Sequence, residues 1–234
     1  KRCSKDKPFV MEIASNDGTF LQRFKDKNCR ILGIDPAQNI ARIANKNGIS
    51  TLPEFFGQSI VDSILDEQGE VDCIYARNVV PHVKNVHDMI SAIAKCLRVN
   101  GTGAIEFYYV KVILEELHYD SIYHEHLHYF SLKTIIFLLK KHDLKAFDLI
   151  ESPINGGSVA LYFSAEDREP SKALKLKLDE ESNSGVNTSL VWQNFADSCH
   201  KHREELVRLI CEEVSIGSQV VGYGASARSS TSKP

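Results

Sequence analysis

Residues 9–18 read Phe9-Val10-Met11-Glu12-Ile13-Ala14-Ser15-Asn16-Asp17-Gly18, and this stretch decides the fold of the chain. An apolar run of strand length passes into a polar loop that holds a single glycine. A helical pattern follows, and a second apolar run, residues 30–34, then ends on Asp35. Strand, loop, helix and strand in this order predict the first unit of a parallel sheet.

The same alternation continues along the chain. Residues 38–47 and 85–97 have helical patterns, whereas residues 71–76 and 103–109 have the apolar composition of buried strands. Helices placed between strands at this spacing predict a doubly wound α/β fold, that is, a Rossmann-like parallel sheet with helices on both faces.

The sheet is predicted to end in an antiparallel hairpin. After a helical pattern at residues 132–141, two strand-like runs at residues 145–152 and 158–164 are joined by the turn Pro153-Ile154-Asn155-Gly156-Gly157. Two strands so closely linked are typical of a hairpin that closes the edge of a sheet.

A change in composition predicts a domain boundary. Residues 165–186 are charged and carry Ser, Asn and Gly, and residues 190–214 then have the pattern of one long helix. We predict a first domain over residues 1–165. Residues 166–234 would hold a linker, the long helix and the beginning of an incomplete C-terminal α/β domain, whose first strand is expected at residues 219–223. Because such a strand needs a helix to cover its apolar face, we expect this chain to be a fragment that is cut off within its C-terminal domain.

Charge and composition exclude several kinds of partner. The chain has 28 basic and 31 acidic residues, a net charge of -3 and no basic patch, so neither nucleic acid nor an anionic membrane is expected to bind. No apolar run approaches the roughly 18 residues of a membrane-spanning helix, and no signal peptide is evident. Six cysteines without a C-x-x-C pair indicate a reducing compartment, and we expect a cytoplasmic protein.

The first loop, from Ala14 to Gly18, is the natural place for a cofactor, because a doubly wound sheet binds ligands beyond the carboxyl ends of its strands. The loop lacks the G-x-G-x-x-G pattern that holds a pyrophosphate. Its Asn16 and Asp17 favour a cationic or zwitterionic ligand instead, and Asp35 is placed to accept hydrogen bonds from both hydroxyls of a ribose. Together these residues predict S-adenosylmethionine rather than NAD.

Each of these features also has a purely structural explanation. Asp17-Gly18 could be a plain turn, and Asp35-Pro36 could cap a helix with proline in its first position. Their order and spacing together favour the cofactor site.

A second candidate site lies in residues 123–130, Tyr123-His124-Glu125-His126-Leu127-His128-Tyr129-Phe130. Histidines beside a carboxylate and tyrosines suit proton transfer, because imidazole titrates near neutral pH and its neighbours tune it. A lone histidine in such a segment could equally satisfy only local hydrogen bonds. In an extended segment Tyr123 and Glu125 would point away from His126, so we expect a turn around Glu125. Five other histidines are expected at the surface: His87, His118, His142, His200 and His202.

Several blocks of the chain together resemble the S-adenosylmethionine-dependent sugar C-methyltransferases, members of which methylate C3 of nucleotide-linked 4-keto-6-deoxyhexoses. The likeness runs from about residue 9 to residue 231. The blocks that carry it are Glu12-Ile13-Ala14-Ser15-Asn16-Asp17-Gly18-Thr19-Phe20-Leu21, Gly33-Ile34-Asp35-Pro36-Ala37, Ala76-Arg77-Asn78-Val79-Val80-Pro81-His82-Val83, Tyr119-Asp120-Ser121-Ile122-Tyr123-His124-Glu125-His126, Asn155-Gly156-Gly157-Ser158 and Val221-Gly222-Tyr223-Gly224-Ala225-Ser226-Ala227.

The resemblance implies a class I methyltransferase domain over residues 1–165, S-adenosylmethionine as cofactor and a nucleotide-linked 4-keto-deoxysugar as the small-molecule substrate. Carbon methylation would proceed through an enolate, with His126 as the base. Glu125 would orient His126 or raise its basicity, and Tyr123 would hydrogen-bond the sugar or its oxyanion. His82 would touch the substrate, although it could instead cap a helix after Pro81.

The resemblance also implies the binding residues. Those expected to bind the cofactor are Ala14, Ser15, Asn16, Asp17, Gly18, Asp35, Pro36 and Asn78. Those expected to bind the substrate are Tyr123, Asn155, Gly156, Gly157, Ser158, Tyr223 and Gly224.

The chain departs from the family pattern in three places. Relatives begin with a cysteine-rich zinc domain, but only Cys3 precedes the first strand here, so zinc is expected only in an N-terminal domain absent from this chain. The G-G-S turn usually carries a histidine where this chain has Asn155, and the following strand lacks the customary arginine. We therefore expect altered sugar binding, and a chain that could hold the cofactor without turnover.

Three other functions stay open on the sequence alone. A methyltransferase acting on oxygen or nitrogen would keep the cofactor, although a base with an oxyanion partner is most needed at carbon. A metal-dependent hydrolase could use His124, Glu125, His126 and His128, but H-E-x-H is not the H-E-x-x-H helix signature, and we expect no metal site. The third is a catalytically silent module that only binds the cofactor. The oligomeric state is open.

Overall fold

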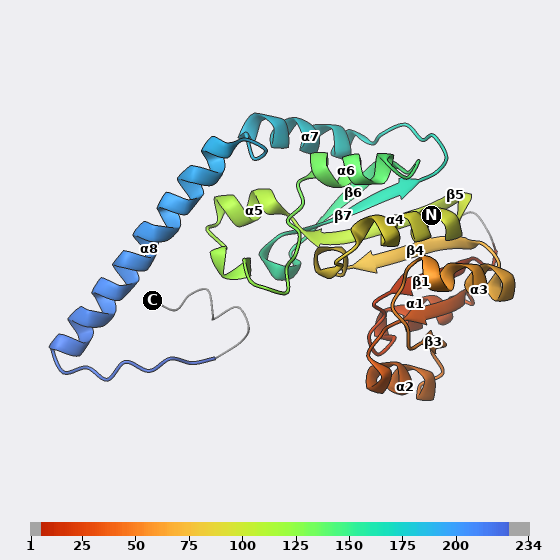
Figure 1. Cartoon of the computed structure of the whole chain (residues 1–234), viewed down its shortest axis with the longest axis horizontal. Coiled ribbons are helices and arrows are strands. Elements are labelled where there is room, and N and C mark those ends of the chain that lie inside the picture. The colour runs from red at the N-terminus through yellow and green to blue at the C-terminus, as the bar shows by residue number, and fades with distance from the viewer. Residues whose placement is uncertain (1–5, 225–234) are drawn as a thin grey trace.

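The computed structural model describes residues 6–224 of the chain. Its centre is one seven-stranded sheet with the strand order β3-β2-β1-β4-β5-β7-β6 (Figure 1). Strands β1 to β5 pair in parallel, whereas β7 runs antiparallel to both of its neighbours, β5 and β6. The strands are β1 (Phe9–Ile13), β2 (Arg30–Ile34), β3 (Thr51–Leu52), β4 (Val71–Arg77), β5 (Leu97–Tyr108), β6 (Lys145–Ser152) and β7 (Ser158–Ser164).

The predicted doubly wound α/β sheet and its antiparallel hairpin are confirmed. The α-helices are α1 (Thr19–Lys25), α2 (Gln38–Lys46), α3 (Gln58–Gln68), α4 (Val86–Cys96), α5 (Val110–Glu115), α6 (Leu132–Lys140), α7 (Lys172–Ser184) and α8 (Ser189–Ser215). Three short 3₁₀ turns are η1 (Val80–His82), η2 (Tyr119–Ser121) and η3 (Ile154–Gly156).

Strand β1 shows why the first apolar run decides the fold. All five of its residues are buried, because helices cover both faces of the sheet at this point. Side chains alternate between the faces of a strand, so Val10 packs with Leu21 of α1 on one face, whereas Met11 belongs to the larger core with Val61 of α3 on the other.

The carboxyl ends of β1 and β4 lie side by side near the centre of the sheet. Strand β1 is paired with β2 on one side and with β4 on the other, so the chain changes direction across the sheet at this pair. Such a switch in strand order is where doubly wound sheets bind ligands. The predicted cofactor loop follows β1 and Asn78 follows β4, so both lie at this switch.

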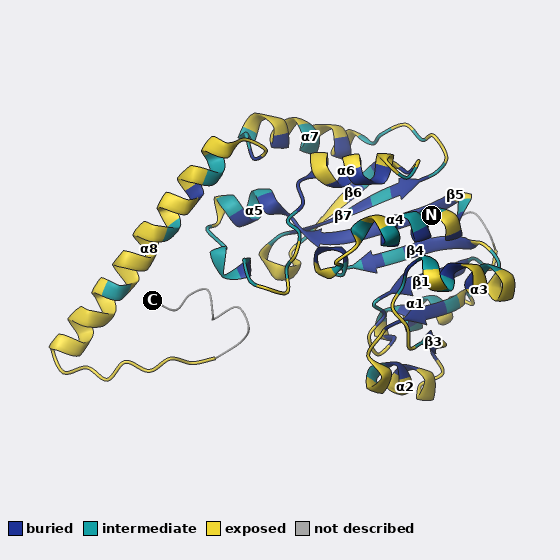
Figure 2. Cartoon of the chain, in the orientation of Figure 1, coloured by how far each residue is buried: buried dark blue, intermediate teal, exposed yellow. Residues whose placement is uncertain are grey.

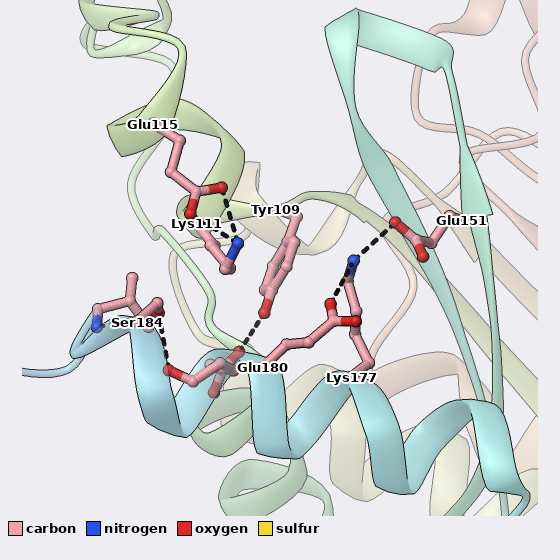
Figure 3. A network of polar contacts seen from close by, with 9 residues as sticks. Tyr109, Lys111, Glu115, Glu151, Lys177, Glu180 and Ser184 are labelled. Carbon is pink, nitrogen blue, oxygen red and sulfur yellow. Dashed lines mark hydrogen bonds and ion pairs between the residues drawn. The ribbon is translucent and has the colours of Figure 1, made fainter.

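The segment expected to be a linker contains helix α7. Ser171 caps this helix by accepting a hydrogen bond from the Leu174 amide, and Leu174 and Glu181 are buried against α6 and β6. The helix is hard to recognise in the sequence because only one narrow stripe of it is apolar. Figure 3 shows Tyr109 pointing toward α7, and Lys177 of α7 placed between Glu151 and Glu180. The division into two domains stays a prediction.

Helix α8 forms as predicted, but the strand expected at residues 219–223 does not. Of the 27 residues of α8 only Phe195 is buried, and the helix extends away from the sheet (Figure 2). Residues 219–223 are exposed and extended without a paired strand. A strand needs a neighbour to satisfy its backbone groups, and no described segment provides one here. Among residues 6–224, no helix has the length and apolar character required to cross a bilayer.

Candidate functional site

The predicted cofactor loop is a sharp turn held by backbone geometry. Ala14 and Asn16 have positive φ angles of 57° and 51°, and Gly18 has a φ of 80°. The Ser15 amide donates to the carbonyl of Ile34 at the end of β2, over 3.2 Å. The loop is therefore fixed against the end of the neighbouring strand.

Glycine is required at the end of this loop. A Cβ on Gly18 would lie 2.6 Å from Cγ2 of Ile49, and a positive φ already disfavours other residues. The Asp17 carboxylate accepts from the Thr19 amide over 3.0 Å, and this hydrogen bond holds the pKa of Asp17 below its ordinary value. The negative charge predicted for the loop is thereby retained, and Asp17 is exposed to a ligand.

Asp35 lies where the ribose-binding acid was predicted. One of its carboxylate oxygens accepts from the Asn16 amide and the other from the Ala37 amide, each over 2.9 Å. Each oxygen has a second lone pair, so this geometry still fits two ribose hydroxyls. Helix α2 has Ala37 as its N-cap, so the alternative in which Asp35 caps this helix is wrong. Pro36 is exposed at the rim of the site.

An ion pair that sequence reasoning missed joins β1 to β4. Glu12 of β1 is fully buried, and its Oε1 lies 2.7 Å from Nη2 of Arg77. Burial raises the pKa of Glu12 to about 7, although the Arg77 charge opposes this change. The Arg77 guanidinium also lies 3.8 Å from the ring centroid of Phe20 in α1. A charged residue inside an otherwise apolar strand was the signal in the sequence.

Next to Asn78 lies a cavity of about 180 Å³. Its lining brings together residues that are far apart in the sequence. The predicted site residues among them are Asn78, His82, Tyr123, His126 and Asn155.

His126 is held in one orientation within this cavity. Its Nδ1 donates to the Ser121 carbonyl over 2.7 Å, which leaves the basic lone pair on Nε2. The His126 amide donates to the Tyr123 carbonyl over 3.0 Å, so the expected turn around Glu125 is confirmed. The turn places the rings of Tyr123 and His126 4.5 Å apart.

The predicted partner of His126 is arranged differently. Glu125 and His124 are both exposed, and the Ser121 carbonyl fixes the His126 ring in the place expected for Glu125. The carbonyl of Glu125 accepts from His82 Nδ1 over 2.8 Å, and the His82 ring lies 4.9 Å from that of His126. His82 therefore ties η1 to the histidine segment and caps no helix. The catalytic role of Glu125 stays a prediction.

The G-G-S turn shapes the opposite side of the cavity. The Asn155 side-chain amide lies 3.5 Å from Oδ1 of Asn78, so these predicted substrate and cofactor residues meet. A Cβ on Gly157 would lie 2.7 Å from Val112, and the buried Ser158 hydroxyl donates to the Ile154 carbonyl over 2.9 Å. Gly156, Gly157 and Ser158 therefore fix the turn, and Asn155 faces the cavity.

The structure does not bring Tyr223 and Gly224 to this cavity. Tyr223 is fully exposed beyond the end of α8. The predictions for Cys3 and for Ala225-Ser226-Ala227 lie outside the described residues. His128 also lines the cavity, and its Nε2 donates to the Val83 carbonyl over 3.1 Å. Within residues 6–224 no cluster of three or more potential ligands could hold a metal ion.

Tyr129 of the predicted histidine segment lines the cavity, and so do Tyr108 and Ile113, which sequence reasoning missed. Burial raises the pKa of Tyr129 above its ordinary value. His118, expected at the surface, is half-buried and hydrogen-bonded to Tyr108. A signal for Tyr108 existed, because it ends β5, the strand next to β4 at the binding edge of the sheet.

Two family models match the chain. The family described as methyltransferase domain matches residues 1–149, and the family described as C-methyltransferase C-terminal domain matches residues 153–232. C-methyltransferase NovU from Streptomyces niveus is 30% identical over 227 residues, which are 96% of this chain and 54% of NovU. The chain thus spans about half the length of this curated relative.

Solved structures share the fold at low identity. A SAM-dependent methyltransferase from Archaeoglobus fulgidus has a TM-score of 0.55 and 14% identity, with 68% of this chain and 86% of that chain covered. The YcgJ protein from Bacillus subtilis has a TM-score of 0.54 and 12% identity, with 70% and 94% covered. The family and the fold support S-adenosylmethionine as the cofactor. The chain therefore belongs to the methyltransferase-domain family, and its sequence continues into that of the C-methyltransferase C-terminal domain.

Proposed function

We propose that this protein is an S-adenosylmethionine-dependent C-methyltransferase that methylates the carbon beside the ketone of a nucleotide-linked 4-keto-deoxysugar. The observation that carries the proposal is the fixed imidazole of His126, which lines a cavity together with Asn78 at the end of β4, the strand paired with β1. Methylation at carbon needs a base that removes a proton next to a carbonyl, and a neutral imidazole is suited to this task. The name of the relative, C-methyltransferase NovU, and the C-terminal family both favour carbon over oxygen or nitrogen.

The cofactor would occupy the loop from Ala14 to Gly18, with Asp35 on its ribose. When bound, it supplies an electrophilic methyl group. Asp17 carries a negative charge within the loop, which favours a zwitterionic amino-acid portion. Asn78 lines the cavity and follows β4, and the cofactor loop follows the paired strand β1, so the methyl group and the acceptor carbon would meet near Asn78.

The size of the cavity supports a sugar ring as the reacting part. At about 180 Å³ it is smaller than the roughly 300–1,000 Å³ of pockets that enclose a whole drug-sized ligand. A single ring could enter, and the nucleotide would lie outside. Tyr123, His82 and Asn155 would hold the ring, whereas nucleotide binding by Tyr223 and Gly224 stays a prediction.

Cofactor binding is the first test. Calorimetry with S-adenosylhomocysteine should give micromolar affinity for the chain. Asp35→Ala should weaken it by about 10- to 100-fold, because hydrogen bonds to a charged group are lost. Asp66→Ala removes an exposed acid from α3 and serves as the matched control. A folded chain that ignores S-adenosylhomocysteine would contradict the proposal.

Methyl transfer is the second test. With labelled S-adenosylmethionine and a thymidine-diphosphate-linked 4-keto-6-deoxyhexose, His126→Ala should lower the rate by about 10²–10⁴-fold. Its affinity for S-adenosylhomocysteine should stay nearly unchanged, because His126 lies outside the cofactor loop. His200→Ala, on the exposed face of α8, is the control. Large loss of cofactor binding in His126→Ala would refute the role of a base.

A further inference from the structure

Tyr108 and His118 form a hydrogen-bonded pair at the wall of the cavity, and neither has a role in the proposed function so far described for His126 and the cofactor loop. Tyr108 is the last residue of β5 and is 7% exposed. Its hydroxyl is bonded to Nδ1 of His118, which lies between α5 and η2. A buried phenol that borders a binding cavity and has an imidazole partner is a candidate catalytic group.

The position of His118 is fixed by its backbone. The His118 amide donates to the Ile113 carbonyl over 2.9 Å, and the His118 carbonyl accepts from both the amide and the hydroxyl of Ser121, over 3.0 and 2.7 Å. The carbonyl of Ser121 in turn holds Nδ1 of His126. One short segment therefore orients both imidazoles, so the position of Tyr108 is tied to that of the base.

The opposite turn makes room for this pair. A Cβ on Gly156 would lie 3.1 Å from Cε1 of His118, which is tighter than ordinary van der Waals contact. Gly156 thus lets the imidazole approach the turn that carries Asn155. Tyr108 belongs to β5 and His118 to the α5–η2 connection, and the G-G-S turn approaches His118 at Gly156.

The chemistry of carbon methylation requires a group of this kind. As His126 takes the proton, the C–H electron pair becomes the C=C bond of an enolate, and the carbonyl π pair moves onto oxygen. The enolate carbon then attacks the methyl group, the C–S bond breaks with its electrons on sulfur, and the C=O bond forms again. The sugar oxygen carries a negative charge only between proton removal and methyl transfer. A hydrogen-bond donor placed at this oxygen therefore lowers the energy barrier to enolate formation.

We propose that Tyr108 is a catalytic residue that donates a hydrogen bond to this oxygen, and that His118 is its positioning residue. In this role Nδ1–H of His118 would donate to the phenol oxygen, and the phenol would donate its own proton to the substrate oxygen in the cavity that Tyr108 lines. Tyr129 also lines the cavity, but of the two phenols Tyr108 is the one whose hydroxyl is hydrogen-bonded to an imidazole. This inference rests on the proposed function, since it names the group that stabilises the enolate.

The test separates enolate formation from methyl transfer. The probe is a thymidine-diphosphate-linked 4-keto-6-deoxyhexose in deuterated water. Exchange of the proton beside its ketone is measured with S-adenosylhomocysteine bound, and methyl transfer is measured with S-adenosylmethionine. Tyr108→Phe should lower both rate constants by about 10²–10³-fold while KM and S-adenosylhomocysteine affinity change little. Tyr162→Phe, which removes a phenol hydroxyl from β7 outside the cavity, should leave both unchanged.

His118 needs a readout that a merely structural role would not move. His118→Ala should lower the exchange rate about tenfold, and His118→Asn, which keeps a donor, should recover part of it. NMR of the imidazole nitrogens should show a protonated Nδ1 on neutral His118 that loses its hydrogen bond in Tyr108→Phe. If Tyr108→Phe exchanges the substrate proton within twofold of the parent rate, the inference about Tyr108 is overturned and the proposed function still stands. If the parent is folded and binds cofactor but neither exchanges the proton nor transfers the methyl group, the proposed function is overturned as well.

Discussion

At the scale of single residues, Glu12 is an acid that the fold has enclosed. Its side chain is 1% exposed, and its Oε2 has no hydrogen-bond partner among the described residues. Burial of a charge is unfavourable, so the neutral form gains in the folded state and the pKa rises from 4.5 to about 7. The folded protein therefore holds a proton that the unfolded chain releases.

This proton makes the stability depend on pH in a defined direction. Below pH 4.5 Glu12 is protonated in both states, and between 4.5 and about 7 only the folded state keeps the proton. The free energy of unfolding should therefore fall by about 3 kcal/mol as the pH rises through this window, and level off above it. Urea unfolding of the parent and of Glu12→Gln at several pH values checks this prediction.

In Glu12→Gln the free energy of unfolding should not fall in this way between pH 4.5 and about 7, because an amide does not titrate. Glu116→Gln, an exposed acid after α5, is the matched control and should keep the fall. Parallel pH profiles for the parent and Glu12→Gln would show that Glu12 is ionised in the folded protein and paired fully with Arg77.

Some residues of the site can be identified from the sequence, and others cannot. Asp35 and Asn78 could be placed because they end strands, and the ends of parallel strands meet at one edge. His126 could be named as a base, but its partner could not. Ser121 contributes a carbonyl, which every residue possesses, and so leaves no sequence signal.

At the scale of elements, the cofactor loop depends on close packing at Gly18. The loop before α1 turns at this residue, and a side chain there meets Ile49 at 2.6 Å as well as an unfavourable φ of +80°. Gly18→Ala should displace the loop and weaken the binding of S-adenosylhomocysteine by at least about tenfold. Calorimetry on the purified variant checks this.

A second glycine, Gly69, separates the effect of steric contact from the effect of a positive φ angle. Gly69 after α3 has a φ of +78°, but a Cβ there would meet nothing within 4 Å. Gly69→Ala should therefore show the strain alone, about 1 kcal/mol of stability, with cofactor affinity unchanged. Equal affinities in Gly18→Ala and the parent would show that the loop takes no part in cofactor binding.

A buried carboxylate, Glu181, links helix α7 to the start of α6. Glu181 accepts from the amides of Leu132 and Lys133 at the start of α6, over 2.6 and 2.9 Å, and from the Tyr109 hydroxyl over 2.7 Å. It thus places a negative charge at the amino end of a helix, where the backbone amides are otherwise unpaired. Burial and this carboxylate both raise the pKa of Tyr109.

Removal of this carboxylate should destabilise the fold. Glu181→Ala leaves two helix amides and a buried phenol without acceptors, and should lower the free energy of unfolding by about 3 kcal/mol. Glu180→Ala, one residue away and exposed in an ion pair with Lys177, should change it by less than about 0.5 kcal/mol (Figure 3). Chemical denaturation of both variants measures the difference, and similar losses in the two would contradict this anchoring.

The elements that the sequence predicted are those with strong apolar patterns. Strand β1 is buried throughout, and α6 presents Leu132, Ile135 and Leu138 to the core. Helix α7 was not foreseen because its anchor is Glu181, a charged residue that normally lies at the surface. The strand expected at residues 219–223 failed for another reason: a strand depends on a partner, and its own pattern cannot supply one.

At the scale of the whole molecule, α8 has one anchored half and one exposed half. Phe195 packs with Tyr108 and Ile113, and Tyr119 is hydrogen-bonded to His202 over 2.9 Å. Beyond His202, Val207 is half-buried, and every other residue of the helix is exposed. The anchored half therefore lies beside the proposed catalytic tyrosine, and the other half extends from the body (Figure 2).

This asymmetry predicts a gradient of hydrogen exchange along α8. An isolated helix of about 12–15 residues is only marginally stable in water, and a surface ion pair such as Arg208–Glu212 adds only about 0.3–0.5 kcal/mol. Amides up to about His202 should therefore exchange slowly, and those from Arg203 to Ser215 much faster. Phe195→Ala should speed exchange in the anchored half, whereas Leu209→Ala should not. Equal protection along the whole helix would mean that its far half is covered in solution, and sedimentation would then show whether a second copy of the chain covers it.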